Sequence, residues 1–276
     1  MTSKIKKKRS SQYLILFAAV LLIGLFSGAS SAQNKNTDAG ELASKLTNPV
    51  ADMISVPFQY NYDANIGTDK KGTSNSLVVQ PVVPIKLNSN WNYIVRPVVT
   101  LQSLSNVNGY SGSGSGPVVV ETFFSPRAAS EFIWGVGPVV STPSLSGSRF
   151  GTAQTGVGVS AVGLWMKGPW TAGLLTYNTW NTGGSSTYGT ANNLYYQPFV
   201  AYVTKNAWTF SLNTQSVFNW DVRRAENPMN ATVSKLVKFG DTPVSFQVGA
   251  RYYLSSMPGG PSGWGARASV TFLLPE

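Results

Sequence analysis

The sequence predicts an all-β fold: an antiparallel up-and-down transmembrane β-barrel of about 12 strands, preceded by a cleaved signal peptide. Three observations support this: an export signal at the start, a composition poor in charge and rich in aromatic residues, and alternating strands joined by alternately short and long connectors. Charged residues make up 12% of the chain and aromatic residues another 12%, with 8 Trp and 12 Tyr. Mean hydropathy is near zero, as expected where lipid-facing and lumen-facing residues average out.

The first 32 residues have the organisation of a secretory signal peptide. Five cations, from Lys4 to Arg9, precede the apolar run "YLILFAAVLLIGLF", which spans Tyr13 to Phe26. The small residues of "SGASSA" then lead to Ala32. A basic n-region, a short apolar h-region and small residues at the cleavage site define such a signal. The alternative is an N-terminal membrane anchor, but a spanning helix needs about 20 apolar residues.

The charge and the missing residue types exclude several classes of function. The formal net charge of +10 falls to about +5 when the five cations of the signal are removed, and the remaining cations are scattered. No nucleic-acid partner is therefore expected. The chain contains no Cys and no His. These absences exclude disulfides, Ser-His catalysis and His-containing metal sites. The sequence predicts a protein that is not an enzyme and has no cofactor and no metal site.

The predicted strands are each roughly ten residues long, the length that a tilted strand needs to cross a bilayer. In chain order they are Met53–Tyr62, Leu77–Leu87, Trp91–Leu101, Pro117–Ser125, Phe132–Val140, Gly156–Met166, Trp170–Trp180, Leu194–Val203, Trp208–Trp220, Met229–Phe239, Val244–Leu254 and Trp264–Leu274. In "PVSFQVGARYYL" every second residue is apolar, whereas most of those between are small, polar or charged. This alternation gives the strand two different faces.

The connectors alternate in length. Short ones such as "NSN", "KGP" and "GDT" alternate with mostly longer ones rich in Gly, Ser and Asn, such as "DANIGTDKKGTSNS" and "QSLSNVNGYSGSGSG". This pattern is typical of outer-membrane barrels, in which short turns face the periplasm. The stretch "GSGSG" at 112–116 lacks the Lys-Ser/Thr pair and the helix of a phosphate-binding loop, so we predict a flexible loop tip there.

The tryptophans indicate which face meets lipid. All eight lie near the ends of predicted strands, most on the apolar face, and we interpret them as two interfacial girdles. Those beside short turns are Trp91, Trp134, Trp165, Trp170 and Trp208, and those beside long loops are Trp180, Trp220 and Trp264. In a soluble sandwich, which is the alternative, tryptophans are expected at mid-strand in the core.

Two features fit the barrel less simply. Several predicted strands contain proline, which removes a hydrogen bond from the ladder and favours edges or bulges; these are Pro57, Pro81, Pro84, Pro97, Pro138 and Pro198. Bulges that face the lumen would accommodate them. The segment 33–52 precedes the barrel at 53–276, and its "ELASKL" suits a short helix ended by Pro49. We predict an N-terminal periplasmic segment here, either a leader into the first strand, an arm or a partial plug of the lumen.

Long blocks of the chain resemble a known family. They include "LTNPVADMISVPFQYNYD", "QPVVPIKLNSNWNYIVRPV", "YYQPFVAYVTKNAWTFSLNTQSVFNW" and "NPMNATVSKLVKFGDTPVSFQVGARYYL". These blocks are similar to a bacterial family of exported proteins described as transporters, often labelled "neuromedin U" and related to the outer-membrane proteins named after the MetA pathway of phenol degradation. The resemblance runs from about Glu41 to Pro275 and implies an outer-membrane barrel and no catalytic residues. Many outer-membrane proteins end in an aromatic residue read by the assembly machinery, an expected partner, whereas this chain ends in "FLLPE".

If the apolar residues face lipid, the alternate residues line the lumen. This predicted set comprises Gln59, Gln80, Arg96, Glu121, Asn213, Gln247, Arg251 and Arg267. Arg96 and Glu121 lie on adjacent strands and are expected to pair. The last loop places Arg251 roughly opposite Arg267, and closure of the barrel brings Arg267 near Gln59.

Like charges so placed destabilise a sheet unless something compensates them. We therefore hypothesise an arginine-bearing constriction that favours anionic or polar solutes. The alternative is that lumen water and carboxylates such as Asp63 solvate the arginines.

The predicted function is that of a passive, porin-like channel or transporter in the outer membrane of a Gram-negative bacterium. Its partners are membrane lipid and an unidentified small solute, anionic or aromatic. One alternative is a structural or adhesive barrel without an open pore. Another, a lipid hydrolase, would need Ser-Lys chemistry because the chain has no His.

Overall fold

The computed structural model describes residues 39–274 except 129 and 241, and the predicted signal peptide at 1–32 lies outside this range. One helix, α2 (Ala39–Leu46), precedes the strands. The strands are β1 (Ile54–Ile66), β2 (Gly72–Val79), β3 (Val83–Lys86), β4 (Trp91–Val107), β5 (Tyr110–Pro126), β6 (Phe132–Ser141), β7 (Ala153–Lys167), β8 (Trp170–Ser185), β9 (Asn193–Val203), β10 (Trp208–Thr214), β11 (Ser216–Asn219), β12 (Arg224–Phe239), β13 (Thr242–Ser255) and β14 (Gly263–Leu274). No helix in this part of the chain has the length and apolar character needed to span a membrane.

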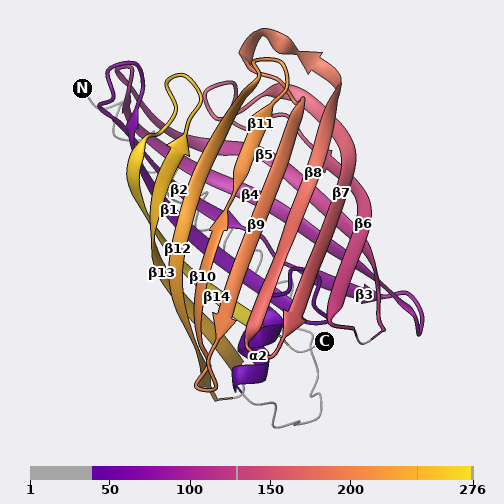
Figure 1. Cartoon of the computed structure of the whole chain (residues 1–276). Helices are drawn as coiled ribbons and strands as arrows, with labels where there is room; N and C mark the ends of the chain where they lie inside the picture. Colours follow the sequence, from indigo (N-terminus) through magenta and orange to yellow (C-terminus); the bar gives the residue numbers. More distant parts are fainter. Residues whose placement is uncertain (1–38, 129, 241, 275–276) are drawn as a thin grey trace. The chain divides into compact units, whose positions relative to one another are not determined.

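The strands form a closed antiparallel barrel, because β1 pairs with β14 as well as with β2 (Figure 1). Two of its positions are each filled by a pair of short strands. Both β2 and β3 pair with β4, and both β10 and β11 pair with β9 and β12. Counting each of these pairs as one interrupted strand gives the predicted 12-stranded barrel.

The two faces of each strand differ as the alternation predicts. On β13, Val248 is 59% exposed on the outside of the barrel, whereas Arg251 is 8% exposed within it. All eight tryptophans are exposed on the outer wall, and several contact a second aromatic ring, as Trp91 contacts Trp134. The outer wall is therefore apolar and aromatic, and the ionisable groups Arg96, Glu121, Asp63, Arg251 and Arg267 are buried within.

Several strands extend beyond the predicted ends into segments predicted as loops. The clearest case is β4–β5, whose hairpin closes at Val107 and Tyr110. The predicted flexible tip at 112–116 is wrong, because these residues lie within β5. A Cβ atom added at Gly114 would lie 2.6 Å from the ring of Phe150. The small residues therefore let the loop 142–152 pack against the strand.

The prolines lie in the closed barrel in different ways. Pro81 falls in the break between β2 and β3, where no ladder bond is lost. Pro138 lies where the β5–β6 ladder is interrupted, between the pairs Glu121–Val139 and Phe124–Val136. The carbonyl oxygen of Pro138 accepts a hydrogen bond of 2.7 Å from the hydroxyl of Thr122, which bridges this gap.

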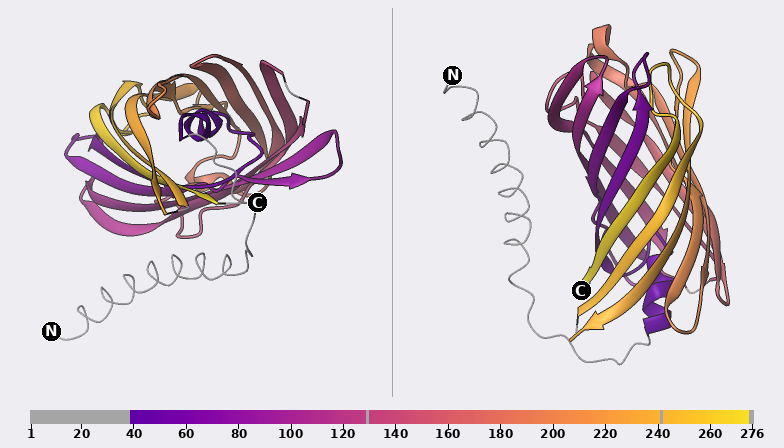
Figure 2. Two further views of the ribbon diagram at one scale, coloured as in Figure 1. Left: turned by 90° about the horizontal axis from the view of Figure 1, so that it is seen from below. Right: turned by 90° about the vertical axis from the view of Figure 1, so that its left-hand side faces the viewer.

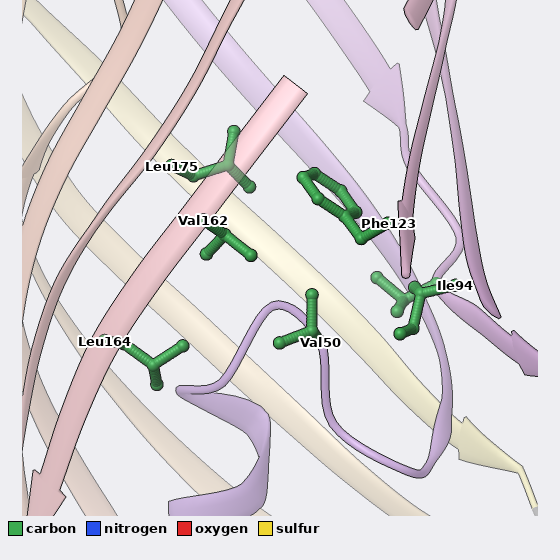
Figure 3. Close-up of a cluster of buried hydrophobic side chains, with 7 residues drawn as sticks. Val50, Ile94, Phe123, Val162, Leu164 and Leu175 are labelled. Atoms are coloured by element: carbon green, nitrogen blue, oxygen red, sulfur yellow. The ribbon is translucent and has the colours of Figure 1, made fainter. Parts of the chain in front are cut away.

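The helix predicted before Pro49 is confirmed as α2, and in the view along the barrel it lies inside the ring of strands (Figure 2). We call residues 39–53 the plug segment. Ala43 of this segment packs with Val203, Ala207, Leu236 and Leu273. Val50 packs with a second apolar group (Figure 3) composed of Val82, Ile94, Phe123, Val162, Leu164 and Leu175. The plug segment therefore fills the end of the lumen beside the short turns, which we call the short-turn end; the opposite end is the loop end.

Candidate functional site in the barrel lumen

Two arginines of the lumen meet at one amide oxygen. Arg267 Nε donates to Asn61 Oδ1 over 2.8 Å, and Arg251 Nη1 donates to the same atom over 3.3 Å. Arg251 Nε also lies 2.9 Å from Asp63 Oδ1. Arg267 Nη2 donates to Gln215 Oε1 over 2.6 Å. We call Asn61, Asp63, Arg251 and Arg267 the arginine cluster.

The four members of the arginine cluster include two guanidinium groups and one carboxylate, and the buried carboxylate of Glu226 on β12 also interacts electrostatically with Arg251. Both guanidinium groups are buried, and Asp63 is the carboxylate that Arg251 contacts. Among the described residues no carboxylate lies within ion-pair distance of Arg267, whose polar contacts are to amide oxygens. A buried cation without a counter-ion attracts anions more strongly than one in bulk water.

A second charged pair lies on the inner wall at β4 and β5. Arg96 and Glu121 are directly opposite in register on β4 and β5, and Arg96 Nη1 lies 2.9 Å from Glu121 Oε2. Arg96 Nη2 donates to Gln80 Oε1 over 2.8 Å. The pair predicted from the sequence is therefore present, and it is electrically balanced.

A chamber of about 230 Å³ lies between the plug segment and the arginine cluster. Leu46 and Thr47 of the plug segment line one end, and Ser269 of β14 lines the other. Arg267 is the next inward-facing residue after Ser269 toward the loop end. The remaining wall is rich in hydroxyl and amide groups, from Ser55, Gln80, Gln197, Thr209, Ser211, Asn213, Ser234, Ser245, Gln247 and Thr271. The chamber is thus polar, and the plug segment forms its wall at the short-turn end.

An aromatic pair also lies within the lumen. The rings of Tyr177 and Tyr195 stack with their centroids 4.8 Å apart and their planes at 10°. The Tyr195 hydroxyl donates to Gln197 Oε1, which fixes its ring near the chamber. A flat face of this kind suits apolar or aromatic solutes as well as water.

Polar contacts join the plug segment to the barrel at Thr47 and Asp52. The hydroxyl groups of Thr47 and Thr171 lie 2.7 Å apart. Asp52 forms an ion pair of 3.1 Å with Arg127 and accepts a bond of 3.2 Å from Asn92. Ala43 and Val50 contact the barrel through apolar packing.

The structure places every residue of the predicted lumen set inside the barrel, but it groups them differently. Gln59 donates to Asn61 Oδ1 and so adjoins the arginine cluster, and Gln80 joins Arg96 and Glu121. Asn213 and Gln247 line the chamber. The predicted register is shifted by two residues, because Arg251 lies opposite Gly265, and Arg267 lies opposite Gly249 and Asn61.

The site includes four residues whose role the sequence pattern does not predict: Asn61, Asp63, Gln215 and Tyr253. The hydroxyl of Tyr253 accepts a hydrogen bond of 2.8 Å from Arg251 Nη2. The sequence pattern predicts a loop at Asp63, whereas β1 continues to Ile66. The run "QYNYD" does carry a signal, since Gln59, Asn61 and Asp63 share one face of a strand. Gln215 lies in the break between β10 and β11, which the sequence pattern does not reveal.

The fold resembles those of solved bacterial outer-membrane proteins. An outer membrane channel from Pseudomonas putida F1 matches with a TM-score of 0.61 at 12% identity, over 80% of this chain and 95% of that chain. Outer membrane phospholipase A from Escherichia coli matches with a TM-score of 0.47 at 11% identity, over 80% and 90% of the two chains. Comparisons with profiles of protein families and with curated sequences gave no match. The chain therefore has the fold of a bacterial outer-membrane β-barrel.

Proposed function

We propose that this barrel is a passive outer-membrane channel for small solutes and that the plug segment gates it. The observation that carries the proposal is the polar chamber between the plug segment and the arginine cluster. A barrel with a purely structural role gains nothing from such a chamber, because buried polar groups stabilise a lumen less than close packing does. The proposal includes membership of the transporter family that the sequence resembles.

The charges of the lumen favour small anionic solutes. Arg267 lacks a carboxylate partner among the described residues, and rings of charged side chains set the selectivity of pores. The stacked Tyr177 and Tyr195 add an aromatic surface at the same passage. A small aromatic carboxylate therefore combines the two features that this lumen can bind.

The orientation of the chain follows from the connectors. Short turns face the periplasm in barrels of this class, so the plug segment would enter the lumen from the periplasmic side. The assembly machinery of the outer membrane is then the partner that inserts the barrel.

A reversible disulfide between the plug segment and the barrel tests the proposed gate. Because the chain has no Cys, the double variant Thr47→Cys/Thr171→Cys introduces one cysteine pair at hydroxyl groups now 2.7 Å apart. We expect the oxidised double variant to show no single-channel conductance in a planar bilayer and to regain it on reduction. Each single variant, treated with the same oxidant and reductant, is the control.

Two results would contradict this proposal. Equal conductance in the oxidised and reduced forms would show that solutes bypass the plug segment. Silence of the folded wild-type chain and of every reduced variant would favour a structural or adhesive barrel. The plug segment, which lines the chamber at the short-turn end, supports that alternative.

A further inference from the structure

A second group of polar side chains lies on the outer wall, at the loop end. Asn178 and Trp180 of β8, Asn192 just before β9, and Trp220 and Asp221 just after β11 line an open hollow of about 480 Å³. β9 pairs with both β8 and β11, so three adjacent strands bring these residues together. The hollow is separate from the lumen and takes no part in the proposed channel.

Hydrogen bonds hold the groups of this hollow in place. Trp220 Nε1 donates to Asn178 Oδ1 over 2.7 Å. Asn192 Nδ2 lies 3.1 Å and 3.2 Å from the two carboxylate oxygens of Asp221. The backbone amide of Asn181 donates to Asn192 Oδ1 over 2.8 Å. The ring of Trp220 and the carboxylate of Asp221 are therefore fixed, while Trp180 remains 53% exposed beside them.

A girdle of aromatic rings at a membrane interface does not require this carboxylate. Asp221 is exposed, and hydrogen bonds from Thr190 and Asn192 hold its pKa below the usual range. It is therefore charged at neutral pH. The other tryptophan near this end, Trp264, contacts the ring of Tyr252 and does not line this hollow.

We propose that this hollow binds a pyranose ring, supplied by the sugar headgroup of a glycolipid in the outer leaflet. The face of an indole is electron-rich and attracts the weakly positive C–H groups on one side of a sugar ring. The carboxylate of Asp221 accepts hydrogen bonds from sugar hydroxyls, and such charge-assisted bonds are the strong ones. The site lies on the lipid-facing wall at the end that faces outward in barrels of this class, at the depth of the headgroups.

The test compares two sources of the same sugar chemistry. The full chain is reconstituted in nanodiscs that contain either deep-rough lipopolysaccharide or phosphatidylglycerol, and the retained lipid is counted by native mass spectrometry. A soluble probe, chitotriose, is titrated in parallel. The site variants are Trp180→Leu and Asp221→Asn. The matched controls are Trp264→Leu, from the same end, and Asp69→Asn, whose carboxylate accepts a hydrogen bond from the Lys71 amide in another loop.

We expect each site variant to retain about fivefold less lipopolysaccharide, the range of a lost aromatic contact or charge-assisted bond, and each control to match the wild type. Heat-modifiable migration on gels would verify that all variants fold. The proposal would be overturned if Trp264→Leu and Trp180→Leu lost equal amounts of lipopolysaccharide, or if the wild type retained lipopolysaccharide no better than phosphatidylglycerol. The tryptophans of the hollow would then be ordinary members of an interfacial girdle. Chitotriose binding that depends on Trp180 and Asp221 without lipid retention would overturn the glycolipid source.

Discussion

Asn61 holds two buried guanidinium groups through one side-chain oxygen. In Asn61→Leu both arginines lose this acceptor, and we expect the free energy of unfolding to fall by about 1–3 kcal/mol, since buried donors are left unsatisfied. In Asn61→Asp the added carboxylate balances the cluster, so the anion preference of the pore should fall while the fold persists. Urea unfolding in micelles and reversal potentials in planar bilayers measure the two effects. Unchanged selectivity in Asn61→Asp would exclude the arginine cluster from the solute path.

Strands β5 and β6 remain joined where the backbone hydrogen bonds between them are interrupted. Between the pairs Glu121–Val139 and Phe124–Val136, the hydroxyl of Ser160 on β7 donates to the backbone carbonyl oxygen of Thr122 over 2.7 Å and to that of Gly137 over 3.1 Å. The close approach of β5 and β6 requires a glycine at position 137, because a Cβ atom added to Gly137 would lie 2.1 Å from the backbone carbonyl oxygen of Thr122.

We therefore expect Gly137→Ala to lower the free energy of unfolding by about 1–3 kcal/mol, as overpacking does, and to speed amide exchange in β5 and β6. Gly163→Ala is the control, because its Cβ would meet Phe132 at 3.5 Å, an ordinary contact. Similar destabilisation by both variants would mean that the loss of glycine itself matters, and the close approach at Gly137 does not.

At the scale of the whole molecule, the barrel is a protein whose apolar surface faces outward. Neighbouring residues of β13 test this directly, because Val248 is exposed on the outer wall whereas Gln247 lines the chamber. Val248→Arg places a charge in lipid and should destabilise the barrel by about 2–4 kcal/mol, while Gln247→Arg should have little effect. Urea titrations of both variants in lipid vesicles give the comparison. Greater destabilisation by Gln247→Arg than by Val248→Arg would contradict the assignment of the apolar face to lipid.

The same alternation explains what the sequence could and could not predict. The alternation of apolar and polar residues predicts the number of strands and the inward direction of Gln59, Arg96 and Arg251. Both predictions follow from the two-residue period, which marks each strand and separates its two faces. The alternation does not predict the ends of β4 and β5, since their Ser and Gly residues also suit loops. The neighbours of Arg251 and Arg267 depend on the register of the strands. The predicted register differs by two residues, so the prediction places Gln59 beside Arg267, where the structure has Asn61.

The plug segment is joined to β1 directly, since Met53 precedes the first residue of that strand. In binding terms it is a tethered ligand, whose effective concentration near its site reaches about the millimolar range for a short link. Its occupancy is therefore independent of how much protein the membrane holds. A free peptide with the sequence of residues 39–53 would displace it only at comparable concentrations. If the plug segment gates the barrel as proposed, opening must come from a change inside the same chain, or from a force that pulls on the chain before Ala39.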